Sequence, residues 1–314
     1  MLVSFVIPHK GRNDLLRKTL LSISNQDIDL NSVQVIIVSQ SPQFSADVLG
    51  ICEGLDVKVH IRPESETISA LRNFGVKHAT GTYLAFLDAD VEIAPDWTQK
   101  MIQVLNEGTN RALVSAIQRN GQHAPVLEKI RTALSNIATD CPVRFLPGRN
   151  LLVRRETFFE VGGFPEHLVT CEDYYFTDQV SRKGELYYST RSSYVHLGED
   201  KHFAEMFRKE IWRGQSNLQS ISGRGVSLRE LPSYLVPVWM LGFAIAATLA
   251  VISGEPKIAL TAAAMGLLPV FVYSIRLSRF VGREIEMIQI LKFYSVYFPA
   301  RMIGTVLGVF RVIR

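Results

Sequence analysis

The chain has 314 residues, of which 47% are hydrophobic, and its 34 Lys and Arg against 30 Asp and Glu leave a net charge of +4. This length allows one large domain or two ordinary ones, and the hydrophobic content is high for a wholly soluble enzyme. Residues 276–314 hold seven Lys or Arg against two Glu, a net of +5, so the residues before them sum to about −1. Because the positive charge is confined to this tail, nucleic acid is not a predicted partner.

Short apolar segments alternate with helical stretches over the first 118 residues. Leu16, Leu20 and Ile23 recur at helical spacing, and Asn13 before them is a candidate N-cap. The strands read as continuous β-branched and aromatic runs, which is typical of a mainly parallel sheet covered on both faces. We expect Pro8 to end the first strand. The expected strands are 2–7, 33–38, 57–61, 83–87 and 111–118, and the expected helices are 12–26, 66–79 and one after Pro95.

Two carboxylates follow the apolar strand at 83–87, in the stretch YLAFLDADVEIAP. Unpaired carboxylates at the end of a buried strand cost several kcal/mol, so Asp88 and Asp90 need a partner. The carboxyl ends of parallel strands are where such sheets bind ligands. Both side chains can reach one cation there, and their hard oxygens suit Mg²⁺ or Mn²⁺ carrying a diphosphate. A helix cap or a solvated loop is the alternative for this motif taken alone.

From about residue 120 the pattern loosens into a segment rich in Gly, aromatic and charged residues, which we interpret as a second lobe that completes the site. Within it, Glu172 and Asp173 are adjacent, so on a helix they point about 100° apart and only one can face the site. One carboxylate in that place can act as a general base on an acceptor hydroxyl. The alternative is that both only charge a helix N-terminus.

The last third of the chain predicts a membrane anchor. Residues 231–254 and 258–275 contain no charged residue, and only three residues separate the two runs. Each is long enough to cross about 30 Å of hydrocarbon as a helix. The basic tail behind them mixes apolar, aromatic and cationic residues as an interfacial helix does, and Pro299 is expected to kink or split it.

The position of the charges also predicts a compartment. An even number of spans puts both chain ends on one side, and the basic tail marks that side as cytoplasmic. The first residues do not read as a signal peptide. Cys52, Cys141 and Cys171 form neither a metal spacing nor a disulfide framework, which suits a reducing compartment. We expect a multi-pass protein of the inner or plasma membrane with a cytoplasmic catalytic domain.

Three segments together resemble one family, the inverting, GT-A-fold glycosyltransferases of family 2. They are SFVIPHKGRNDLLRKTLLSISNQ, ISALRNFGVKHATGTYLAFLDADVEIAPDW and GRNLLVRRETFFEVGGFPEHLVTCEDYYFTDQVSRKG, in the family's order within residues 2–200. The resemblance implies a GT-A (Rossmann-like) domain at 1–230, with a nucleotide-binding half at 1–118 and an acceptor half at 119–230. Two transmembrane helices at 231–275 and an amphipathic, basic surface tail at 276–314 would follow.

The resemblance also implies roles for single residues. Asp88 would contact the nucleotide and share the metal with Asp90, and Asp173 would be the general base, ahead of Glu172. His196 would complete the metal shell, although a histidine at a strand end is more often a structural hydrogen-bonding residue. Arg149, after a Pro-Gly turn, would contact diphosphate or acceptor, or simply form the turn. The full candidate set for the nucleotide sugar is Pro8, Lys10, Arg12, Ser39, Gln40, Arg72, Asp88, Ala89 and Arg149.

One departure from the family pattern concerns the nucleotide base. The family usually carries Asp-Asp or Asp-Asn after its second strand, where this chain has Ser39 and Gln40. A serine accepts a hydrogen bond from a base N–H without charge-assisted strength. The identity of the base therefore stays open.

The expected function is transfer of a sugar from a nucleotide diphosphate to a hydroxyl of a lipid-linked or membrane-associated acceptor, with Mn²⁺ or Mg²⁺ as cofactor. Envelope polysaccharide or glycolipid synthesis would be its setting. One alternative is a polyprenyl-phosphate glycosyltransferase, whose anionic acceptor needs no general base. The other is an inactive, membrane-bound nucleotide-binding or scaffold protein. The sequence predicts neither the sugar nor the oligomeric state.

Overall fold

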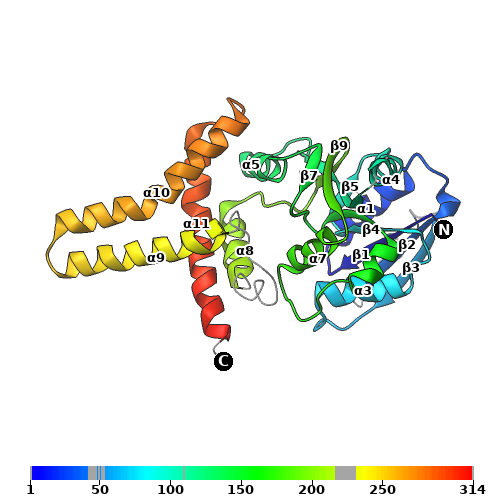
Figure 1. The fold of residues 1–314 in the computed structure, drawn as a ribbon, viewed down its shortest axis with the longest axis horizontal. Coiled ribbons are helices and arrows are strands. Elements are labelled where there is room, and N and C mark those ends of the chain that lie inside the picture. The colour runs from blue at the N-terminus through cyan, green and yellow to red at the C-terminus, as the bar shows by residue number, and fades with distance from the viewer. Residues whose placement is uncertain are drawn as a thin grey trace. The chain divides into compact units, whose positions relative to one another are not determined.

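The structure is a computed structural model that describes residues 2–41, 48, 50, 54–108, 110–215 and 231–312. The chain divides into two compact units (Figure 1). The first comprises Met1–His123 and Ser135–Glu199, and the second comprises Ala124–Leu134 and Asp200–Arg314. The domain boundary expected at residue 230, as well as Cys52 and residues 313–314, lies outside the described residues.

The first unit is an α/β domain built on one nine-stranded sheet of order β3-β2-β1-β4-β8-β6-β9-β5, with β7 paired to β9. Its strands are β1 (Val3–His9), β2 (Val33–Ser39), β3 (Asp56–Ile61), β4 (Tyr83–Leu87), β5 (Val91–Ile93), β6 (Arg111–Arg119), β7 (Cys141–Val143), β8 (Asn150–Arg154) and β9 (Glu185–His196). Its helices are α1 (Asn13–Ser24), the short 3-10 helix η1 (Leu30–Ser32), α3 (Ile68–Lys77), α4 (Trp97–Glu107), α6 (Arg155–Glu160) and α7 (Glu172–Ser181).

The sheet is mixed and mostly parallel, which confirms the expected Rossmann-like fold. Strands β3, β2, β1 and β4 run parallel to one another, and β6 is parallel to β9. Strand β8 enters between β4 and β6 and is antiparallel to both. The five strands expected from the sequence are all present, within one or two residues of the predicted ends.

Helices pack on both faces of this sheet, as the continuous hydrophobic strands predicted. Successive side chains of a strand point to opposite faces. Phe5 and Ile7 of β1 therefore join one core with α1 and α4, whereas Val6 joins a second core with α3, α6 and α7. Burial on both faces explains why β1 carries apolar residues without alternation.

Two local expectations are wrong. Strand β1 does not end before Pro8 but continues to His9, with Pro8 opposite Val38 of β2. Pairing of β1 with β4 stops at Val6, and the carbonyl of His9 accepts from the N–H of Gln40, just after β2. The missing N–H of Pro8 therefore faces the other side, where pairing with β4 has ended. The N-cap of α1 is Arg12 in the left-handed conformation, at φ 54°, rather than Asn13.

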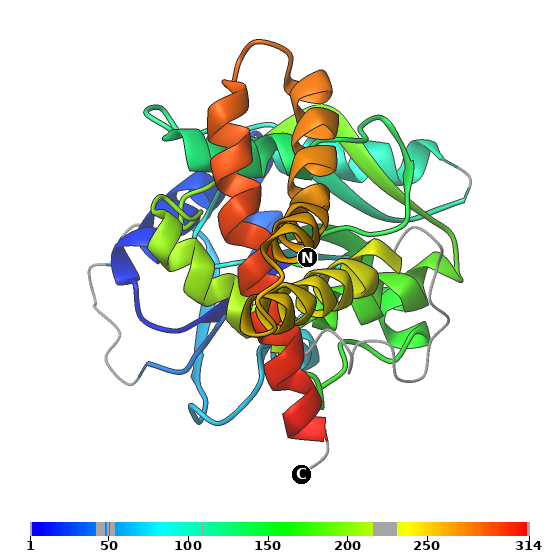
Figure 2. The same cartoon turned by 90° about the vertical axis from the view of Figure 1, so that its left-hand side faces the viewer.

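The second unit is entirely helical in its described part. Its helices are α5 (Val126–Ser135, whose last residue belongs to the first unit), α8 (Phe203–Gln215), α9 (Leu231–Ile252), α10 (Pro256–Val281) and α11 (Met287–Val312). Helices α9 and α10 form a hairpin closed by three residues, and both are long and apolar enough to cross a membrane. Leu235 and Leu260 on this hairpin are 60% and 74% exposed. Figures 1 and 2 show α9 and α10 side by side, with α11 crossing them.

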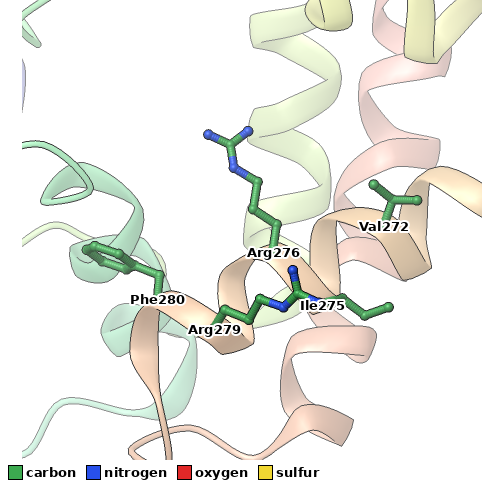
Figure 3. A pocket seen from close by; sticks show the side chains of 5 residues that line it. All are labelled: Val272, Ile275, Arg276, Arg279 and Phe280. Atoms are coloured by element: carbon green, nitrogen blue, oxygen red, sulfur yellow. The ribbon is translucent and has the colours of Figure 1, made fainter.

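Helix α11 is continuous through Pro299, so the expected split of the tail does not occur. It packs on α8, α9 and α10, and contributes Phe293 and Phe298 to the core of this unit. The end of α10 carries two arginines, Arg276 and Arg279, beside apolar side chains. Figure 3 shows both arginines extending from the helix next to the labelled residues Val272, Ile275 and Phe280.

Candidate active site

The turn between β4 and β5 carries the two aspartates of the predicted motif. Asp88 follows the last residue of β4, and its backbone N–H donates to the carbonyl of Arg149 at 3.2 Å. The N–H of Val91 returns to the carbonyl of Asp88 at 3.3 Å, which closes the turn. The side chain of Asp88 is partly exposed, at 30%, whereas that of Asp90 is 6% exposed. The turn therefore presents two carboxylates of different accessibility at one strand end.

Arg72 of α3 joins this turn to the acidic pair of α7. Its Nη2 donates to Asp88 Oδ1 at 2.9 Å, and its Nη1 donates to Glu172 Oε1 at 3.0 Å. Its side chain is 1% exposed, and Nη2 also donates to the carbonyl of Gly148 at 3.2 Å. Burial lowers the pKa of Arg72, but the charges of Asp88 and Glu172 raise it by more. Asp88 and Glu172, which are 84 positions apart in the sequence, therefore share one buried cation.

The acidic pair lies in the first turn of α7, and its two members have different partners. Glu172 is held by Arg72, whereas Asp173 accepts hydrogen bonds from the backbone N–H groups of Gly148 at 3.1 Å and Tyr174 at 2.8 Å. Burial and the charge of Asp173 raise the pKa of Glu172 to about 7. Burial also raises the pKa of Asp173. Both carboxylates are thus stronger bases than they would be in water.

Asp90 lies between a cation and an imidazole. Arg12 Nη1 donates to Asp90 Oδ2 at 2.9 Å, and His196 Nε2 lies 3.4 Å from Asp90 Oδ1. Burial raises the pKa of Asp90, but His196 and Arg12 lower it by more, so the carboxylate stays ionised. For His196, burial lowers the pKa, and hydrogen bonding with Asp90 and Glu199 raises it by more.

Arg149 is tied into a buried network beside His196. Its Nε donates to the hydroxyl of Tyr194 at 3.0 Å, and its Nη2 donates to Ser135 at 3.0 Å. Its Nη1 lies 3.6 Å from Glu199 Oε2. The side chain is 17% exposed; burial lowers the pKa of Arg149, and the neighbouring Tyr194 hydroxyl and Glu199 carboxylate raise it by more. Each arm of this guanidinium already has a protein partner.

Ser39 and Gln40 are also engaged within the protein. Ser39 is fully buried, and its hydroxyl lies 2.9 Å from His9 Nδ1 and accepts from the N–H of Ser41 at 3.0 Å. The amide of Gln40 donates to the carbonyls of Pro63 and Glu66, each at 2.9 Å. These two side chains therefore shape the end of β2 and its neighbouring loop.

The remaining candidates lie around the same edge of the sheet. Lys10 is exposed and pairs with Glu64 at 3.4 Å. Pro8 is buried in β1, and Ala89 packs on the core between the two aspartates. The structure thus brings all the predicted site residues of the first unit to the carboxyl ends of β1, β2 and β4, the N-terminus of α7 and the end of β9.

For a divalent ion, this edge supplies two suitable donors. The carboxylate of Asp90 and the Nε2 of His196 face each other, and an oxygen–imidazole pair suits Mn²⁺. Asp88 is instead held by Arg72. Among the residues that the structure describes, no group of three or more His, Cys, Asp or Glu side chains is close enough to hold an ion. The protein donors fit a metal that takes its other ligands from a substrate.

Three residues of the candidate site were not predicted from the sequence. Glu199 contacts both His196 and Arg149, Tyr194 contacts Arg149, and His9 contacts Ser39. Of these three, only Glu199 could have been predicted from the sequence, because it is an acidic residue three positions after His196 and can therefore contact the imidazole. The other two contacts join residues that are 30 or more positions apart.

Acidic side chains at the carboxyl ends of the parallel strands of an α/β sheet mark the edge where such folds bind their ligands. Residues 4–163 match the model of glycosyl transferase family 2. The chain belongs to this family and is a glycosyltransferase. Among curated proteins it is similar to glycosyltransferase AglE of Haloferax volcanii, with 23% identity over 256 residues that cover 76% of this chain and 80% of that protein.

Two solved structures show the fold. The mannosyltransferase PcManGT from Pyrobaculum calidifontis, in complex with GDP-Man and Mn²⁺, has a TM-score of 0.65 and 14% identity, and the match covers 98% of this chain and 87% of that one. Residues 1–349 of S. aureus TarS, in complex with UDP-GlcNAc, give a TM-score of 0.52 and 15% identity over 100% of this chain and 93% of that one. The first unit thus has the expected GT-A fold.

Proposed function

We propose that this chain is a membrane-anchored, inverting glycosyltransferase that moves a sugar from a nucleotide diphosphate to a hydroxyl of a lipid-linked or membrane-associated acceptor. Envelope polysaccharide or glycolipid synthesis is the proposed setting. The main observation behind the proposal is the position of Arg72, which bonds to both Asp88 and Glu172 at one edge of the sheet. In the proposal, Asp88 faces the donor and Glu172 faces the acceptor. A transferase needs both substrates at one such edge.

On the acceptor side, Asp173 is the proposed general base. Its carboxylate takes the proton of the acceptor hydroxyl as that oxygen bonds to the anomeric carbon and the bond to the diphosphate breaks. Two backbone N–H groups orient Asp173, while Arg72 holds Glu172 beside it. The raised pKa of Asp173 favours the proton transfer, because a stronger base accepts the proton more readily.

On the donor side, Asp90 and His196 are the proposed metal-binding residues, with Asp88 oriented by Arg72 toward the nucleotide. A bound Mn²⁺ or Mg²⁺ would neutralise the charge that develops on the leaving diphosphate. Arg12 is exposed and contacts Asp90, so it is available to meet a phosphate oxygen as well. Solved relatives of this fold carry GDP-Man in one case and UDP-GlcNAc in another, so the base is left open.

The hairpin α9–α10 supports the membrane part of the proposal. Its two helices are long and apolar enough to span, and the arginines that follow the apolar run of α10 suit the headgroup level of a cytoplasmic leaflet. An anchored catalytic unit would meet acceptors that are confined to the same membrane.

The test is nucleotide release by the purified full chain with UDP-, GDP- and dTDP-sugars, Mn²⁺ and membrane lipid extract as acceptor. We expect release from one donor, and a loss of at least about 100-fold in Asp90→Asn and Asp173→Asn. Full activity of Asp173→Asn would instead favour the polyprenyl-phosphate glycosyltransferase, whose acceptor needs no base. Binding of nucleotide without turnover of any donor would favour the inactive scaffold.

A further inference from the structure

Glu199 lies against the side of His196 that faces away from Asp90. Glu199 Oε2 is 3.0 Å from His196 Nδ1, and His196 Nε2 is 3.4 Å from Asp90 Oδ1. The two ring nitrogens of one imidazole thus face two different carboxylates. Since a neutral imidazole donates through one nitrogen and accepts through the other, the neighbour of Nδ1 decides what Nε2 can do.

Two groups compete for Nδ1. Arg149 Nη1 lies 3.5 Å from this nitrogen, at the limit of a hydrogen bond, whereas the Glu199 carboxylate lies at 3.0 Å. A guanidinium can only donate, and a carboxylate can only accept. The shorter contact carries a charge, so Nδ1 keeps its hydrogen and donates it to Glu199. The lone pair of the neutral ring then lies on Nε2.

The surroundings hold Glu199 in this place. Its side chain is 4% exposed, Arg149 Nη1 lies 3.6 Å from Oε2, and the amide of Gln118 donates to the same oxygen at 3.4 Å. The turn that carries Glu199 is also tied to the metal motif, because the N–H of Leu197 donates to the carbonyl of Asp90 at 2.8 Å. A Cβ at Gly198 would collide with the Asp90 carboxylate, so only glycine allows this approach.

We propose that Glu199 is a positioning residue of the metal site: it fixes His196 with hydrogen on Nδ1, so that Nε2 offers its lone pair beside Asp90 to a divalent cation. A metal-binding histidine commonly donates its second nitrogen to a carboxylate, and loss of that partner costs 10- to 100-fold in affinity. Arg149 supports Glu199 in this arrangement. The inference rests on the metal dependence in the proposed function.

The test is the dissociation constant of Mn²⁺ in the presence of UDP or GDP, measured on the full chain from the paramagnetic resonance signal of free Mn²⁺. We expect Glu199→Gln to raise this constant by about 10-fold or more, because glutamine keeps the shape and loses the charge. Glu107→Gln is the matched control, since Glu107 is an exposed partner of Arg191 in the same unit, and we expect it to bind Mn²⁺ like the parent chain.

A double mutant separates positioning from a general structural role. If Glu199 acts through His196, then Glu199→Gln combined with His196→Ala should bind Mn²⁺ no more weakly than His196→Ala alone. Additive losses, or an unchanged constant in Glu199→Gln while Asp90→Asn loses Mn²⁺, would overturn the inference and leave the proposed function intact. A parent chain that turns over a donor but binds no Mn²⁺ would overturn both the inference and the metal dependence.

Discussion

At the scale of single residues, the organising group of the candidate site is a buried arginine. Arg72 stood among the residues expected to bind the nucleotide sugar, but its side chain is almost fully enclosed and bonds to Asp88 and Glu172. A cation in this position compensates the negative charge of two carboxylates at one edge of the sheet. In the proposed function, Arg72 therefore acts through the two carboxylates that it holds.

We predict that Arg72→Gln destabilises the first unit by about 3 to 5 kcal/mol, because it leaves Glu172 and the partly exposed Asp88 without their cation. Equilibrium unfolding in urea of the purified chain measures this change. Arg62→Gln is the control, since Arg62 pairs with Glu66 at the surface, where solvent screens the pair. Equal losses in the two variants would contradict the organising role of Arg72.

The acidic pair predicts a pH dependence of stability. The pKa of Glu172 is about 7 in the folded chain, against an ordinary value of 4.5. The folded state therefore holds the proton more tightly than the unfolded state, and this stabilisation is complete below pH 4.5 and lost as the pH rises through 7. We expect the melting temperature to fall from pH 5 to pH 8 by more in the parent chain than in Glu172→Gln. Equal slopes in both proteins would show that Glu172 is not the titrating group.

At the scale of elements, the crossing of α8 and α11 depends on glycines. Gly304 of α11 lies against Gly214 of α8, and a Cβ on Gly304 would collide with the backbone oxygen of Ile211. Glu210 of α8 also pairs with Arg131 of α5 and Arg301 of α11, so a buried carboxylate joins three helices. Burial raises the pKa of Glu210, and the nearby arginines lower it by more, to about 2.

We predict different effects for two glycine-to-alanine changes in long helices. Gly304→Ala should destabilise the chain by about 1 to 3 kcal/mol, because the added methyl group overpacks the crossing. Gly242→Ala of α9 should be neutral or stabilising by up to about 1 kcal/mol, because nothing lies within 4 Å of the added atom and alanine favours helix. Thermal unfolding of both variants in one detergent measures the difference, and equal effects would contradict the close crossing.

At the scale of the whole molecule, the hairpin α9–α10 predicts on which side of the membrane each part of the chain lies. If α9 and α10 both span, their connection lies on one side of the membrane and both chain ends lie on the other. This sidedness would bring the catalytic unit and the basic tail to the same leaflet. It would also place the hairpin turn outside the cytoplasm.

Labelling of single cysteines in intact cells measures this sidedness. In a chain whose three cysteines are replaced, we expect a membrane-impermeant maleimide to label Ser253→Cys in the hairpin turn. Lys18→Cys, on an exposed position of α1, should react only after the membrane is opened. Labelling of both positions from outside, or the reverse order, would contradict the proposed topology.

Much of this architecture was predictable, because it depends on local patterns. The strands at 83–87 and 111–118, the helix at 66–79 and the two long apolar helices all follow from runs of residues that are neighbours in the chain. The exceptions are informative. Pro8 was expected to end β1, but a proline is tolerated where no strand continues on its N–H side, and that depends on where β4 ends.

By itself, the sequence determined the alternation of strands and helices, the acidic motif at Asp88 and Asp90, the acidic pair on α7 and the apolar hairpin. Only the tertiary structure decided which distant charged groups meet: Arg72 with Asp88 and Glu172, and Glu199 with Arg149. The physical reason is that hydrophobic periodicity depends on neighbouring residues and can therefore be read from the sequence alone. Ion pairing between side chains 16 to 100 positions apart depends instead on strand order and on how closely turns can approach.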